Sequence, residues 1–185
     1  EIPPDQRDDI QIGFRKFQED TFFRGSGIQQ EYTNWGLRRC IEETNVFGTN
    51  TTVAGPFQYA IDGTGIDIVV QDSGIEPNHP EWEDANGNSR LQQINWYTES
   101  GLPGTQSAGF YSDFDGHGSH CAGIAAGKTY GWAKGARIYS QKLQGLEISG
   151  PSGISIADAF DTIRLWHANK PIDPDTGVKR PTVVN

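Results

Sequence analysis

The sequence lacks long apolar runs, has few cysteines and is poor in basic residues. No apolar stretch approaches the ~18 residues that a membrane-spanning helix needs, which argues against a transmembrane protein. Two cysteines among 185 residues, Cys40 and Cys121, are too few for a disulfide framework, so they leave the redox compartment open. The net charge of −9 argues against nucleic acid and anionic membrane surfaces as partners.

What the sequence does contain is typical of one loop-rich globular domain. Its 185 residues are enough for a substantial core and too few for two large domains. A hydrophobic content of 35% with 5 Trp argues against a disordered chain, and 23 Gly and 10 Pro indicate many turns. Residues 1–30 show no regular period, and residues 43–58 and 99–113 have loop composition.

From Gly65 onward, strand and helix patterns alternate. A β-branched run indicates a buried strand at residues 66–71, and alternation indicates another at 135–143. Further strands are expected at residues 91–96 and 181–185, the second of them buried, and helices are expected at 119–126 and 154–168. The last helix carries an apolar stripe that we expect in the core: Ile156, Ala159, Phe160, Ile163 and Trp166. This alternation predicts an α/β fold with a parallel sheet.

Two polar residues stand where such folds build their sites. Asp72 follows the first buried strand, at the carboxyl end where open α/β sheets form clefts; taken alone, a turn-capping role is the more common one. His117 lies between two glycines at the start of a helix of small residues. The helix dipole there disfavours imidazolium and suits a general base, whereas the structural alternative is a Gly-rich turn into a core helix.

The order of these two residues points to one kind of chemistry. Asp72 precedes His117 by 45 positions. In a serine hydrolase triad, the His takes the proton of the nucleophile and the Asp fixes its tautomer. The order Asp, His and then Ser is one of the known orders of that triad.

The flanking motifs resemble those of subtilisin-like serine proteases. Residues 72–74 (Asp-Ser-Gly) are similar to the Asp box of that family, and residues 117–123 (His-Gly-Ser-His-Cys-Ala-Gly) are similar to its His box. The Cys at the fifth place of this box resembles the proteinase K-like, thiol-dependent branch. Further resemblance lies at residues 34–39, 74–82, 135–138 and 183–185.

The resemblance implies both a fold and a function. The expected fold is a doubly wound, mostly parallel sheet with helices on both faces, incomplete in this chain. Residues 1–33 would be an N-terminal arm or leader remnant, and 34–185 the N-terminal part of a catalytic domain. Asp72 would orient His117 as general base on a peptide or protein substrate. A main-chain substrate edge would lie at Ile148, Ser149 and Gly150.

One family motif is missing. The nucleophile box, Gly-Thr-Ser followed by small residues and Pro, occurs nowhere in the sequence. The oxyanion-hole Asn of the family also belongs beyond Asn185. We therefore expect this chain to be inactive alone, with the rest of the protease domain on the same or another chain.

No metal ligand is assigned from the sequence, and no cofactor is expected to be required. Calcium is a common structural ion in the family, but Asp84, Asn86 and Asn88 lack the bidentate Glu of a calcium loop and favour a solvated turn. An alternative metal site would join His117, His120 and Cys121, completed by residues from elsewhere in the chain. The residues that folding would have to bring in are Cys40, His79 or His167.

Two hypotheses keep the fold but change the chemistry. The domain could be an inert structural or binding module of a larger assembly, since fold does not fix function. Cys121 could be a nucleophile beside His117, although side chains on successive turns of one helix are expected to diverge. The resemblance favours an extracellular or particle-associated location over the cytoplasm.

Overall fold

The structure is a computed structural model of the chain, and it is described for residues 61–107, 109–143 and 156–185. Also described are the backbone of residues 18–20, 22–23, 31–32, 57–59 and 146–147, and the single residues Leu37 and Cys40. The chain forms two compact units, Glu1–Asp62 and Gly63–Asn185. The division of the sequence at residue 33 stays a prediction. Within the described residues, no helix is long and apolar enough to cross a membrane.

The first unit contains short antiparallel strand pairs. Strand β1 (Gln18–Asp20) pairs with β4 (Phe57–Tyr59), and β2 (Phe22–Phe23) pairs with β3 (Glu31–Tyr32). No regular period was visible at residues 1–30, which contain β1 and β2, and the loop expected at 43–58 is wrong for the start of β4. Strands of two or three residues are too short for a period of two to be recognised.

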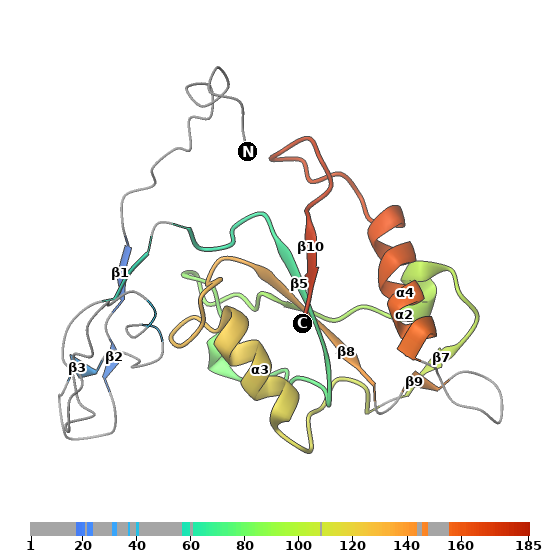
Figure 1. Ribbon diagram of the computed structural model, residues 1–185, viewed down its shortest axis with the longest axis horizontal. Helices are drawn as coiled ribbons and strands as arrows, with labels where there is room; N and C mark the ends of the chain where they lie inside the picture. The colour runs from blue at the N-terminus through green and yellow to red at the C-terminus, as the bar shows by residue number, and fades with distance from the viewer. Residues whose placement is uncertain are drawn as a thin grey trace. The chain divides into compact units, whose positions relative to one another are not determined.

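A four-stranded parallel sheet forms the centre of the second unit (Figure 1). Its order is β10 (Thr182–Val184), β5 (Asp67–Asp72), β8 (Arg137–Lys142) and β6 (Leu91–Gln92), and every pairing is parallel. The parallel sheet expected from the alternating pattern is therefore confirmed. A separate antiparallel pair joins β7 (Thr105–Gln106) to β9 (Leu146–Glu147).

Helices cover both faces of this sheet. On one face, Ile68 and Val70 of β5 pack with Ala122 and Ala126 of α3 (His117–Ala126). Because successive strand residues point to opposite faces, Val69 belongs to the other core, which includes aromatic residues of α2 (Trp96–Ser100) and α4 (Ile156–Asn169). Figure 1 shows α3 on one side of β5 and β8 and the paired α2 and α4 on the other. The doubly wound arrangement is thus confirmed, with a partial sheet.

One predicted strand ends early. Residues 91–96 were expected to be extended, but β6 covers only Leu91–Gln92, and α2 begins at Trp96. Asn95 is the N-cap of α2: its Oδ1 accepts the N–H groups of Tyr97 and Thr98 at 3.1 and 3.0 Å. An Asn side chain satisfies the first donors of a helix in this way, so it starts α2 inside the predicted strand. The expected loop at 99–113 accordingly contains the end of α2 and β7.

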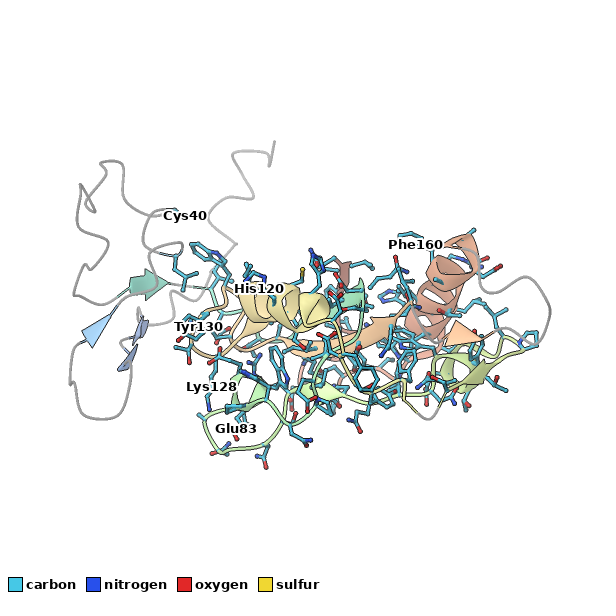
Figure 2. All side chains as sticks on the ribbon, turned by 90° about the horizontal axis from the view of Figure 1, so that it is seen from below. Cys40, Glu83, His120, Lys128, Tyr130 and Phe160 are labelled. Atoms are coloured by element: carbon cyan, nitrogen blue, oxygen red, sulfur yellow. The ribbon has the colours of Figure 1, made fainter. Side chains whose placement is uncertain are left out.

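Two predictions of burial are also wrong. Phe160 projects from α4 with 49% of its surface exposed (Figure 2), because it lies about 100° around the helix from Ala159 at the centre of the buried face. Residues 181–185 form β10 as expected, yet Val183 is 55% exposed. Strand β10 is at the edge of the sheet and pairs with β5 alone among the described strands.

Buried polar side chains hold the C-terminal end of α3. The Nη2 of Arg90 donates to the carbonyl oxygens of Ala126 at 2.7 Å and Glu81 at 3.1 Å, and its Nη1 donates to that of Ala136 at 2.9 Å. The Glu81 carboxylate, from the short 3-10 helix η2 (Pro80–Trp82), accepts the N–H of Thr129 at 2.9 Å. Helix α3 is therefore fixed at the end opposite His117.

A buried charge cluster ties β10 and the end of α4 to the start of β5. The carboxylate of Asp67 accepts from Lys170 Nζ at 2.9 Å and from Arg180 Nε at 2.8 Å. Arg180 also donates to Asp173 at 3.1 Å. Asp67 and Lys170 are almost fully buried, so neither charge is compensated by water.

We expect Asp67→Ala to cost about 3–5 kcal/mol of unfolding free energy, because removing one partner leaves buried cations uncompensated. Chemical denaturation followed by circular dichroism measures this loss. The matched control is Asp161→Ala, which breaks the exposed pair between Asp161 and Arg164 on α4 and should cost about 0.5 kcal/mol or less. Equal losses in the two variants would contradict the assigned role of the cluster.

Candidate functional site

Asp72 occupies the position that the sequence predicted for it. It is the last residue of β5, at the carboxyl end of a parallel strand. The N–H of Ser73 donates to Asp72 Oδ1 at 2.7 Å, which fixes the carboxylate at the start of the following turn. Its side chain is 18% exposed.

His117 is the first residue of α3, and its ring lies against this carboxylate. The Nδ1 of His117 is 2.8 and 2.9 Å from the two oxygens of Asp72. An ionised carboxylate only accepts hydrogen bonds, so Nδ1 is the donor and the unprotonated nitrogen of the neutral ring is Nε2. The side chain is 66% exposed, which leaves the ring open to a reacting group. The predicted pairing of these two residues is present in the structure.

Glycine is required on each side of His117, but for a different physical reason at each position. Gly116 has φ of +89°, a left-handed conformation that side chains rarely adopt. Gly118 is needed for space: a Cβ there would lie 2.0 Å from the carbonyl oxygen of Gly74 and 3.1 Å from the Cβ of Asp72. The tight turn expected from the sequence is thus combined with close packing of α3 on the strand end.

Asp113 organises the start of α3, a role that was not predicted from the sequence. Its Oδ1 accepts from Ser73 Oγ and from the N–H of Gly116, both at 2.9 Å. Its Oδ2 accepts from the N–H of Ser119 at 2.9 Å and from the Ser119 hydroxyl at 2.6 Å. Ser73 Oγ in turn accepts the N–H of Gly118 at 2.9 Å. An acidic residue just before a predicted helix start was the available signal.

Hydrogen bonds set the charges of both acids. Burial opposes ionisation of Asp113, but the hydrogen bonds from Ser119, Gly116 and Ser73 outweigh it and lower its pKa to about 2. Burial likewise disfavours the Asp72 anion, yet the Ser73 N–H and the His117 ring outweigh it, so the pKa of Asp72 is lowered. Both groups are therefore anions at neutral pH.

Asp72 determines the direction in which the pKa of His117 is shifted. The hydrogen bond and the charge of Asp72 raise the pKa of His117 above its ordinary value of 6.5. From the sequence, the helix dipole was expected to favour the neutral ring, whereas the net shift of the His117 pKa has the opposite direction. A full charge in direct contact exceeds the partial charge, about half a unit, of a helix end.

Cys121 comes closer to His117 than expected. Its Sγ is 3.7 Å from Nδ1 of His117, so the expected divergence of these side chains is wrong. Burial and then the negative charge of Asp72 raise the pKa of the Cys121 thiol. A thiol held protonated is a poor nucleophile, which counts against Cys121 as the nucleophile. Both Cys40 and Cys121 are free thiols.

Some of the other residues singled out in the sequence lie outside the described part of the chain, and others lie outside this cluster. The predicted substrate edge at Ile148, Ser149 and Gly150 lies outside the described residues. Among the described residues, the one group of His, Cys and acidic side chains close enough to share a metal ion is Asp72, His117 and Cys121, without His120. Asp84 accepts the N–H groups of Asn86 and Asn88, each at 2.8 Å, as expected of a turn.

Comparison with known proteins gives matches to proteases. The sequence model of the protein family described as the subtilase family matches residues 63–172 of this chain. The cuticle-degrading serine protease of Arthrobotrys oligospora is 35% identical over 119 residues, which are 62% of this chain and 25% of that protein. The cuticle-degrading protease of Metarhizium anisopliae is 34% identical over 142 residues, 74% of this chain and 31% of that protein.

Two further matches are of the same kind. Proteinase R of Parengyodontium album is 32% identical over 125 residues, 66% of this chain and 26% of that protein. Among solved structures, the CspB protease of Clostridium perfringens is 24% identical with a TM-score of 0.45, covering 69% of this chain and 29% of that one. The chain thus spans between 25% and 31% of the length of these three curated relatives.

We expect Asp72→Asn to lower the pKa of His117 towards 6.5, because the amide keeps the shape of the side chain but removes the charge that stabilises imidazolium. An NMR titration of the His117 ring measures this shift. Asp161→Asn, an acid on α4 paired with Arg164, is the matched control and should leave the titration unchanged. A His117 titration that does not move in Asp72→Asn would contradict the pairing.

We expect Asp113→Asn to lower the unfolding free energy by about 1–2 kcal/mol at neutral pH, because the start of α3 loses its charged acceptor. The pKa of Asp113 is about 2 in the folded protein and 3.8 ordinarily, so its stabilisation is present above pH 3.8 and is lost as the pH falls towards 2. Urea unfolding at several pH values should therefore show the two proteins converging in acid.

The control for this pH dependence is Asp115→Asn, which changes an exposed acid in the same loop. It should not produce the converging pattern. A constant difference between the wild-type protein and Asp113→Asn across the acidic range would show that the charge of Asp113 does not stabilise the helix start.

Proposed function

Because this chain belongs to the subtilase family, we propose that it supplies the acid and base of a serine endopeptidase. In this proposal Asp72 orients His117, and the nucleophilic serine and the oxyanion-hole asparagine lie outside these 185 residues. Substrates are peptides or proteins. The names of two relatives specify a cuticle as their substrate, which favours an extracellular location for this protein.

The contact between Asp72 and His117 is the observation that carries the proposal. Both carboxylate oxygens lie within 2.9 Å of Nδ1, so Nε2 is the nitrogen left to accept a proton. In the reaction, Nε2 would take the proton of the serine hydroxyl as the serine attacks the peptide carbonyl. Imidazolium, stabilised by Asp72, would then give that proton to the leaving amine.

The serines next to the pair in sequence do not suit the nucleophile's role. Ser73 Oγ donates to Asp113 and accepts from Gly118, and the Ser119 hydroxyl donates to Asp113 while accepting the N–H of Glu76 at 2.9 Å. Both hydroxyls thus serve the start of α3. This supports a nucleophile contributed by residues outside the present sequence.

Labelling with a fluorophosphonate tests the proposal on the source protein, including the residues that follow Asn185. We expect one labelled serine outside residues 1–185, identified by mass spectrometry. His117→Ala should slow the labelling by about 10⁴-fold or more, since it removes the base. The matched control is His120→Ala, an exposed histidine on the same helix, which should label at the wild-type rate.

Two results would contradict the proposal. A protein that folds and keeps the Asp72–His117 contact but labels at no serine would be an inert module of the family. Labelling at a serine within residues 1–185 would show that the nucleophile has been assigned to the wrong part of the protein.

A further inference from the structure

We propose that Asp72, His117 and Cys121 form a reversible binding site for zinc, and that bound zinc blocks the base. The ligand atoms of these three side chains all lie within 4.8 Å of one another. Their chemistry is mixed: one carboxylate oxygen, one imidazole nitrogen and one sulfur. Zinc binds each of these ligand types in proteins.

The separations of these atoms suit a tetrahedral ion. With zinc–ligand bonds of about 2.0–2.3 Å, the ligand atoms of a tetrahedral site stand about 3.3–3.6 Å apart. In the structure Nδ1 is 2.8 Å from Asp72 Oδ1 and 3.7 Å from Cys121 Sγ. These two separations are within about 0.5 Å of the tetrahedral values, and the third, between Cys121 Sγ and an Asp72 oxygen, is at most 4.8 Å.

Regular secondary structure holds the ligands in place. His117 and Cys121 are four residues apart on α3 and share one face of the helix. Asp72 ends β5, against which α3 packs without an intervening Cβ at Gly118. Ligands on a strand end and a packed helix lose little freedom on binding an ion.

The site has an open side. The His117 side chain is 66% exposed, so the cluster lies at the surface, where a bound ion would keep a water molecule as its fourth ligand. The metal site considered from the sequence was a different set, with His120 in place of Asp72. His120 lies on the same helix (Figure 2) but outside the cluster.

Binding at Nδ1 would change the chemistry of the ring. The thiol of Cys121 releases its proton to solvent, the ion takes the place of the proton on Nδ1, and that displaced proton passes through solvent to Nε2. The neutral imidazole then carries its one proton on Nε2, which becomes a donor and can no longer accept the proton of a serine. This consequence for catalysis rests on the proposed function, whereas zinc binding itself does not.

Cobalt titration of the purified, chelator-treated protein tests the binding. We expect a thiolate-to-cobalt charge-transfer band that saturates at one ion per chain and disappears when zinc is added. Cys121→Ser should abolish the band, while the matched controls Cys40→Ser and His120→Ala should keep it. Asp72→Asn should weaken binding by about 10-fold or more, because the loss of even an outer-shell partner of a metal ligand lowers metal affinity by about that factor.

Several results would overturn the proposal. They are the absence of the band in the wild-type protein, its persistence in Cys121→Ser, and its loss in either control. NMR of the wild-type protein gives a second readout that needs no variant to fold. The His117 ring signals should change on addition of one equivalent of zinc, and unchanged signals at saturating zinc would refute the site.

A labelling experiment separates this proposal from the proposed function. Zinc should slow fluorophosphonate labelling of the wild-type protein, and this sensitivity should be lost in Cys121→Ser. If no serine is labelled at all, the proposed function fails, yet the cobalt titration still decides whether the ion binds. If labelling proceeds and zinc does not slow it, zinc does not block the base and that part of the proposal fails.

Discussion

The site depends on how closely the first turn of α3 approaches the turn after β5. A Cβ at Gly118 would lie 2.0 Å from the Gly74 carbonyl oxygen, so any other residue there would force helix and strand apart. With glycine, the backbones meet and His117 lies 2.8 Å from Asp72. The contact is therefore a result of backbone packing, with each side chain projecting from a regular element next to the point of closest approach.

At this close approach, the backbone N–H groups in the first turn of α3 need hydrogen-bond acceptors within the protein. Asp113 and Ser73 accept the N–H groups of Gly116, Gly118 and Ser119, and Asp113 also accepts from the hydroxyl of Ser73 itself. The helix start and the strand end are thereby joined through one carboxylate. Because Arg90 holds the opposite end of α3, the helix is fixed at both ends while the His117 ring remains exposed.

The sequence predicted the parts of the structure that depend on local pattern. The strand before Asp72 and the helix after His117 were both visible, because a β-branched run and a run of small residues between glycines are strong signals. Asp113 was missed because its role needs three segments in contact, and Ser73 is 40 residues away from it in sequence. Phe160 fits the apolar spacing of α4, yet it lies at the margin of the buried face. Spacing alone does not define that margin.

The protonation of His117 illustrates how a tertiary contact outweighs a local effect. The N-terminus of a helix carries a partial positive charge spread over several peptide groups, and it disfavours imidazolium. Asp72 brings a full negative charge to within 2.8 Å of one ring nitrogen. The nearer and larger charge prevails, so the pKa of His117 is raised. His117 is therefore a stronger base. It takes a proton more readily, but a higher pH is needed to keep the ring neutral before the reaction. The same acid that orients the ring therefore also sets the lower limit of the pH range in which the ring can act.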